Sequence, residues 1–409
     1  KGLEDTSFYR YNRLVSLNEV GGEPRQFGIS LSTFHHQNHD RARRAPHTLL
    51  TTSTHDTKRS EDVRARINVL SEMPEEWHKH MAKWRRINRN WRKHLEDGDQ
   101  TPSLNAEYLF YQTLLGVWPL QDPDADGMET LAERMAQYML KAAKEAKTYT
   151  SWINPDTAYE EALTRYIRGV LLRPSSMFLD DFLPFQRMLA RFGLYNALSQ
   201  TLLKLTCPGV PDLYQGTEFW DFSLVDPDNR RPVDYAARQA SLHGLQGALY
   251  CEEPRELAKM LLDMTDHLTD GRLKQYITTA VLRYRSHHRD LFLKGNYIPL
   301  DVTGSGADHV IAFARQWEDQ AAITVAPRLL YTLYTQGTRS ARKNSLPCGK
   351  RLWKDTAIVL PESLHGLSFR NVLTREGMPV YGAGKEPHSC KIEISDILKD
   401  LPVGFLSVC

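Results

Sequence analysis

The sequence predicts a fold of the α/β class in which a large helical block precedes an antiparallel β domain. Three observations support this. Residues from about 60 to 200 have almost continuous helical periodicity. From about residue 283 onward, short blocks rich in Val, Ile and Phe alternate with Gly, Asp and Pro, which is typical of antiparallel strands. Two further strand-like blocks, at 47–54 and 202–222, are flanked by Gly or Pro.

The first strand-like block leads directly into the helical block. "HTLLTTST" (47–54) combines β-branched residues with leucines after Pro46, which predicts a short buried strand. "SEDVRARINVLSEM" then has helical spacing. Ser60 is placed to be the N-cap, with two acidic residues following in the first turn.

A basic, aromatic segment follows in the helical block. Trp77, Trp84 and Trp91 recur every seven residues, with lysines and arginines between them. Basic residues interleaved with aromatic ones could bind nucleic acid. An amphipathic helix with its tryptophans turned inward and a solvated basic face explains the same pattern, and we favour it.

Composition excludes several classes of protein. Lys and Arg number 52 and Asp and Glu 50, so no global charge indicates a nucleic-acid or membrane partner. No apolar run approaches membrane length, and the first residues lack a signal-peptide pattern. The five cysteines are scattered without a CxxC motif, which indicates free thiols and a cytoplasmic protein.

The doublet His55-Asp56 in "TTSTHDTKRSEDVRARI" is the main candidate for chemistry, and it has several interpretations. Asp56 could cap the following helix. The doublet could ligate a metal ion, as in an HD-type phosphohydrolase, with "FHHQNHD" (34–40) nearby in sequence. Such domains carry the doublet on a helix, whereas here a strand is predicted before it. The third interpretation is a catalytic carboxylate at the end of a strand.

Three long motifs resemble the maltooligosyltrehalose synthases, a family of the α-amylase-like glycoside hydrolase clan. They are "KGLEDTSFYRYNRLVSLNEVGG", "TSTHDTKRSEDVRAR" and "PGVPDLYQGTEFWDFSLVDPDNRRPVDY", in the family's order. The resemblance implies the carboxyl-terminal part of a (β/α)8 barrel with a helical insertion, followed by a β-sandwich. It assigns 1–60 to late barrel strands and helices, 61–200 to the insertion, 201–282 to the last barrel strand and helix, and 283–409 to the sandwich.

The same resemblance implies a reaction and a site. Members of the family convert the reducing-end α-1,4 linkage of a maltooligosaccharide into an α,α-1,1 linkage, without a cofactor or a metal ion. Asp56 matches the clan's third catalytic carboxylate, and His55 matches a substrate-binding histidine. The other residues expected to bind substrate are Lys58, Arg59, Asp212, Tyr214, Glu218 and Lys1.

The nucleophile and the acid/base carboxylate of the family lie upstream of "KGLEDT", and Glu4, Asp5 and Glu19 do not match them. We therefore expect the chain to be a piece of a longer enzyme, inactive without its amino-terminal half. A non-catalytic carbohydrate-binding protein is the remaining alternative. In "DPDNRRPVD", Asp226 to Arg231 could contact sugar or form a charged turn closed by internal ion pairs.

Overall fold

The computed structural model describes residues 2–95, 100–173, 176–336, 346–382 and 390–409. The chain folds into two compact units. The helical unit contains Lys1–Phe27, Ser53–Leu194 and Asp221–Pro232, and the sheet unit contains Gly28–Thr52, Tyr195–Trp220 and Val233–Cys409. Within the described residues, no helix is both long enough and apolar enough to cross a membrane.

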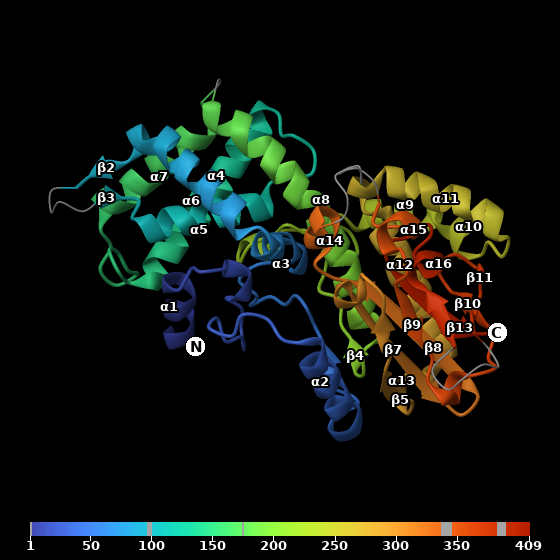
Figure 1. The fold of residues 1–409 in the computed structure, drawn as a ribbon. Helices are drawn as coiled ribbons and strands as arrows, with labels where there is room; N and C mark the ends of the chain where they lie inside the picture. Colours follow the sequence, from blue (N-terminus) through green and yellow to red (C-terminus); the bar gives the residue numbers. More distant parts are fainter. Residues whose placement is uncertain (1, 96–99, 174–175, 337–345, 383–389) are drawn as a thin grey trace. The chain divides into compact units, whose positions relative to one another are not determined.

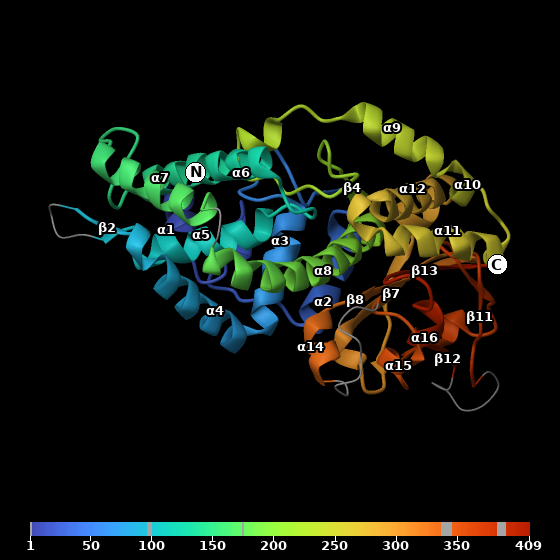
Figure 2. The same cartoon turned by 90° about the horizontal axis from the view of Figure 1, so that it is seen from above.

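The helical unit is built from the block that the sequence predicted to be helical. Its main elements are α1 (Gly2–Arg10), α3 (Glu61–Asn68), α4 (Pro74–Ile87), α5 (Leu104–Val117), α6 (Ala125–Ala146), α7 (Thr157–Leu171) and the first part of α8 (Met177–Thr206). A two-residue ribbon, β2 (Lys93–His94) with β3 (Gln100–Thr101), adds the only strands described in this unit. Figures 1 and 2 show α6 and α7 side by side, and these helices pack on one another.

Side-chain caps explain where three of these helices begin. Ser103, Asp124 and Asp156 each accept a hydrogen bond from the backbone N–H three residues later, at the first turns of α5, α6 and α7. Such caps satisfy donors that have no partner within a helix. The polar residues between the apolar blocks therefore fix the helix starts.

Two of the three tryptophans of the basic segment face inward, as predicted. Trp77 and Trp84 of α4 are buried, and the ring of Trp84 packs against Phe178 and Phe182 of α8. Trp91 lies beyond the end of α4 in a 3-10 turn. Several of the basic residues also have internal partners: Arg85 and Arg92 both pair with the fully buried Glu107. An amphipathic helix therefore accounts for this segment.

The sheet unit contains two antiparallel sheets, as the Val-, Ile- and Phe-rich blocks predicted. The larger sheet has the order β11 (Gly377–Met378), β10 (Phe369–Asn371), β13 (Gly404–Val408), β8 (Gln320–Pro327), β7 (Val310–Trp317) and β5 (Asn296–Pro299). The smaller has the order β12 (Lys391–Glu393), β9 (Ala357–Val359) and β6 (Val302–Thr303). β7 and β8 form a hairpin in which Val310 pairs with Pro327 and Trp317 with Gln320.

Helices precede and interrupt these sheets. They are α2 (Leu31–Arg44), the end of α8, α9 (Tyr235–Gly244), α10 (Gln246–Leu249), α11 (Pro254–Asp266), α12 (Arg272–His287), α13 (Arg289–Leu293), α14 (Leu330–Gln336), α15 (Lys350–Trp353) and α16 (Ile394–Ile397). All five cysteines of the chain are free, in agreement with the sequence analysis.

One predicted element is wrong in length and in burial. Only Leu49–Leu50 of the block 47–54 forms a strand, β1, and Leu49 is 67% exposed. β1 pairs in parallel with β4 (Val210–Pro211), its one partner among the described strands. A strand with a single neighbour cannot bury both of its faces and edges, so the apolar run is left partly in solvent.

Candidate functional site

The doublet His55-Asp56 lies in a tight turn of the helical unit. Two threonines shape this turn: Thr54 Oγ1 accepts from Asp56 N at 3.1 Å, and Thr57 Oγ1 donates to Thr54 O at 2.9 Å. Threonine hydroxyls bond nearby backbone groups readily, which explains why "TSTHDT" turns rather than continuing as a strand. His55 is exposed and Asp56 is half-buried.

The interpretation of Asp56 as a helix cap is wrong. α3 begins at Glu61, and its N-cap is Ser60, as the sequence predicted. The hydroxyl of Ser60 donates to Asp221 O instead of capping the helix. The hydroxyl of Ser53 accepts a hydrogen bond from Glu61 N at 2.8 Å, and so satisfies a backbone donor at the start of α3. The Asp56 carboxylate is therefore not needed to start α3.

A second segment, from the far end of the third motif, holds the turn. Asn229 Nδ2 donates to Thr54 O at 3.3 Å and to His55 O at 3.2 Å. Asn229 belongs to the 3-10 turn Asp228–Arg230 and is almost fully buried. Residues 174 positions apart in the sequence are thereby joined by paired hydrogen bonds, which fixes the backbone on which Asp56 sits.

Helix α6 anchors that second segment through two cations. Arg134 forms a two-pronged ion pair with Asp228, at 3.0 Å and 2.9 Å, and Lys141 Nζ donates to Asp226 Oδ1 at 2.8 Å. Paired contacts between guanidinium and carboxylate are geometrically specific. The charged turn is thus closed by ion pairs, mostly to α6, while Arg231 adds one within the turn.

The charges around the turn shift the pKa of both aspartates of this segment. The hydrogen bond from Lys141 lowers the pKa of Asp226, against the effects of burial and of the nearby negative charge of Asp56. Burial raises the pKa of Asp228, but the bonds from Arg134 outweigh it and hold that pKa below its ordinary value. Two carboxylates, Asp56 and Asp226, therefore share one electrostatic neighbourhood with a lysine.

Lys58 and Arg59 are buried and bond other groups of the protein. Lys58 Nζ pairs with Asp5 at 2.6 Å. Arg59 donates to Val15 O and to the hydroxyl of Tyr138. Because both cationic groups bond protein groups, a sugar hydroxyl would have to compete with these partners. Their expected contacts with substrate stay predictions.

Glu19 has a part in the site that sequence reasoning did not find. Its carboxylate accepts from Lys58 N, at 2.8 Å and 3.0 Å, and from Arg59 N at 3.3 Å. It therefore fixes the backbone just after the turn. The signal was present in "NEVGGEP", where an acidic residue stands before a tight turn, but nothing in the sequence says which backbone it reaches.

Three further candidates lie in the sheet unit, in the loop after β4. Asp212 is exposed and its N–H donates to Leu50 O at 2.8 Å. Tyr214 is half-buried, and its carbonyl accepts from Thr217. Glu218 pairs with Arg238 at 3.2 Å. The structure thus gathers these three in one loop, and Lys1, the remaining candidate, lies outside the described residues.

The histidine-rich segment has ordinary partners. It forms part of α2, where His35 Nδ1 bonds the Tyr297 hydroxyl at 2.8 Å and His36 lies 3.7 Å from Asp40. Burial lowers the pKa of His35. Across the described ranges, no group of three or more His, Cys, Asp or Glu side chains is arranged to hold a metal ion. His55-Asp56 also lies in a turn, not on the helix that an HD-type site requires.

Comparisons with known proteins find relatives that share part of their length with the chain. No family model matches it. Two proteins from Mycobacterium tuberculosis strains, provisionally named maltooligosyl trehalose synthase, are 40% identical over 324 residues, covering 79% of this chain and 37% of their own length.

Solved structures of the same family of enzymes are also similar to the chain. The maltooligosyltrehalose synthase of Arthrobacter ramosus is 34% identical with a TM-score of 0.76, over 99% of this chain and 44% of that one. Another maltooligosyl trehalose synthase is 31% identical with a TM-score of 0.73, over 99% and 46%. The chain is thus similar to one part of the maltooligosyltrehalose synthases and spans less than half the length of these relatives.

Proposed function

We propose that the chain is the carboxyl-terminal portion of a maltooligosyltrehalose synthase and supplies one carboxylate, Asp56, to its active site. The observation that carries this proposal is the similarity to the Arthrobacter ramosus enzyme over nearly the whole chain. The His55-Asp56 turn adds to it, because paired bonds from Asn229 and the ion pairs on α6 hold it from a distant segment.

The reaction would be an intramolecular transglycosylation. In retaining chemistry, one carboxylate attacks C1 and a second donates a proton to the leaving O4, the two lying about 5 Å apart. The freed terminal glucose then turns, and its 1-hydroxyl attacks C1 of the glucosyl residue that is bound to the first carboxylate. The second carboxylate takes the proton from that hydroxyl. The bond C1–O4 is exchanged for C1–O1, and no water is consumed.

Asp56 would act beside these two carboxylates, which we expect in an upstream segment. As a fixed anion in a tight turn, it can accept hydrogen bonds from two sugar hydroxyls and favour the positive charge that develops at C1. His55, exposed on the same turn, would bind a neighbouring hydroxyl. Asp212, Tyr214 and Glu218, which share the loop after β4, would contact another part of the maltooligosaccharide.

A (β/α)8 barrel belongs to the proposal as well. β1 and β4 are adjacent and parallel, as the seventh and eighth strands of such a barrel would be. Each has one partner among the described strands. Upstream strands would supply the missing neighbours, so the chain alone should expose strand edges and associate with itself. The five free cysteines support a cytoplasmic location.

Activity of the rejoined enzyme tests the function. The chain is joined to its upstream segment and incubated with maltopentaose, and we expect reducing ends to disappear while the total of glucosyl residues stays constant. Asp56→Asn should lower kcat by on the order of 10²- to 10³-fold, whereas Asp319→Asn, an exposed aspartate in the β7–β8 hairpin, should not. Release of glucose alone, or turnover unaffected by Asp56→Asn, would refute the proposal.

A further inference from the structure

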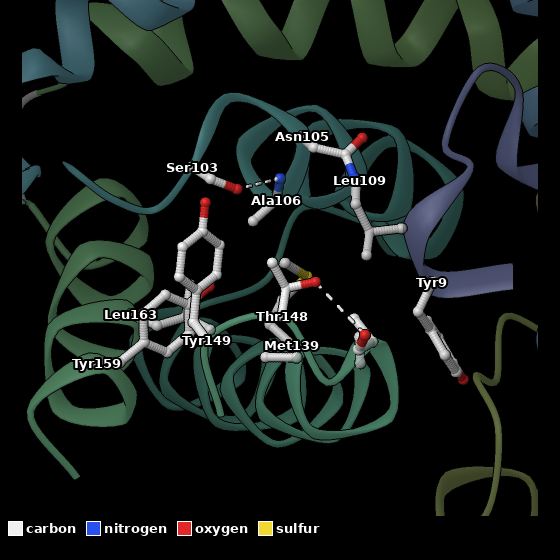
Figure 3. A pocket seen from close by; sticks show the side chains of 13 residues that line it. Tyr9, Ser103, Asn105, Ala106, Leu109, Met139, Thr148, Tyr149, Tyr159 and Leu163 are labelled. Atoms are coloured by element: carbon white, nitrogen blue, oxygen red, sulfur yellow. Dashed lines mark hydrogen bonds between the residues drawn. The ribbon is translucent and has the colours of Figure 1, made fainter. Parts of the chain in front are cut away.

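A cavity of about 130 Å³ lies inside the helical unit, apart from the residues of the His55-Asp56 turn. Its walls come from α5, α6, α7 and the loop after α6, and Figure 3 shows them from close by. Ligands of drug size need roughly 300 Å³ or more, while a cavity of roughly 150 Å³ holds a molecule as small as benzene. The size suits a single small ring.

The lining has an apolar floor and a polar rim. We call its apolar side chains on α6 the floor (Met139, Ala142 and Ala143) and its polar side chains the rim (Ser103, Asn105, Thr148 and Tyr149). No charged side chain is among the residues that line it. A charged ligand would lose its hydration there without a counter-charge, so the occupant should be neutral.

The rim keeps hydrogen-bonding capacity after its internal bonds are counted. Ser103 Oγ accepts from Ala106 N, which leaves its O–H to donate. Asn105 donates through Nδ2 to Arg10 O, which leaves Oδ1 to accept. Thr148 donates to Ala146 O and can still accept. A ligand that both donates and accepts at several positions, as a polyol does, matches this set.

An aromatic ring forms one wall. Tyr149 is 37% exposed, and its inner face is stacked on the buried Tyr159, with ring centroids 5.0 Å apart and planes 14° from parallel. The stack holds the Tyr149 ring in one orientation at low entropic cost. Three residues further on, Trp152 is 59% exposed and is held by a hydrogen bond to Glu145 of α6.

The pocket and the His55-Asp56 turn use different faces of α6. Met139, Ala142, Ala143 and Ala146 follow a spacing of three and four residues, so they form one stripe. Lys141 is two residues from Met139, which rotates it by roughly 200° around the helix. One helix thus carries the pocket on one face and an anchor of the candidate site on another.

We propose that this pocket binds one glucosyl residue of an α-1,4-glucan, as a second sugar site outside the reacting centre. A pyranose ring is neutral, has an apolar face for the alanine floor and the Tyr149 ring, and carries hydroxyls for the rim. The choice of glucose over another neutral sugar rests on the proposed function.

Binding of maltotriose, measured calorimetrically in an Asp56→Asn background that prevents turnover, tests this inference. Tyr149→Ala should weaken the binding attributable to the pocket about fivefold to tenfold, and Tyr149→Phe should weaken it less because the ring remains. Ala143→Leu, which fills the floor, should abolish it. Tyr235→Ala, an exposed tyrosine of α9, serves as the control and should change nothing.

Thermal unfolding midpoints show whether each variant folds. If Tyr149→Ala does not fold, Tyr149→Phe still tests the contribution of the rim. Maltotriose binding that is unaffected by all three pocket variants would overturn the inference. Equal binding of a charged sugar such as glucuronate would overturn it as well. The test is separate from the transglycosylation assay, because failed turnover with binding that depends on Tyr149 would refute only the proposed function.

Discussion

The two loops nominated from sequence are held in different ways. Paired bonds from Asn229 and the carboxylate of Glu19 fix the His55-Asp56 turn and the residues after it, and α6 ties down the segment that carries Asn229. The loop 212–218 is held mainly by bonds within itself, from Thr217 to Tyr214 O, and by Arg238, which donates to Gly216 O and pairs with the partly exposed Glu218. A group that must stabilise a transition state benefits from a fixed position, whereas a group that only binds substrate tolerates more freedom.

Breaking the ion pair on α6 should have the largest effect on stability. Arg134→Ala leaves Asp228, which is mostly buried, without its two-pronged partner. The cost should be about 2–3 kcal/mol of unfolding free energy, measured by urea titration. Arg187→Ala, which removes an exposed pair with Asp122, should cost less than about 1 kcal/mol. Equal losses in both variants would mean that α6 does not anchor the turn.

Acid should weaken the same anchor. The pKa values of Asp226 and Asp228 are lowered in the folded state, so their contribution is fully present above the unfolded value of about 3.9 and is lost as pH falls through the folded values. Unfolding free energy should therefore be level near pH 6 and fall below about pH 4. Asp228→Asn should make this fall shallower, and an unchanged slope would contradict the assignment.

Removing Asn229 should loosen the His55-Asp56 turn and should cost less unfolding free energy than Arg134→Ala does. Asn229→Ala deletes the bonds to Thr54 O and His55 O, which should cost about 1–2 kcal/mol. In the rejoined enzyme we expect kcat to fall more than KM rises, because Asp56 loses its fixed position. Asn154→Ala, at an exposed asparagine, is the control. A change in KM alone would show that Asn229 does not position Asp56.

The loop after β4 should give the smallest response. Glu218→Gln removes a partly exposed pair with Arg238 and should cost less than about 1 kcal/mol. If Glu218 binds substrate, KM for maltopentaose should rise while kcat stays near its original value. Glu256→Gln, which removes the exposed pair with Lys259, provides the matched control. A large loss of unfolding free energy in Glu218→Gln would show that the loop 212–218 is held as firmly as the His55-Asp56 turn.

Local patterns predicted much of the fold. Helical spacing, inward tryptophans and the antiparallel strands follow from neighbours within a few residues, and the structure has them. The sequence overestimates the strand at 47–54, because it does not record that β1 pairs with β4 alone among the strands that the structure describes. Periodicity indicates which residues could form a strand, but pairing decides how many do.

The site was predictable only in part, for the same reason. The His55-Asp56 doublet is visible locally and through its family resemblance. Its supports are not: Arg134 and Lys141 share a face of α6, but their partners lie 94 and 85 residues away. Glu19 contacts backbone 39 residues further on. Such long-range contacts leave no periodic signal.

The division of the chain has a consequence for how the protein can be made and cut. Neither unit is continuous: the chain passes between them after Phe27, Thr52, Leu194, Trp220 and Pro232. A single cleavage therefore cannot release either unit whole. Each unit needs segments that are separated in the sequence before its core can close, so the helical unit cannot complete its fold until Asp221–Pro232 has been synthesised.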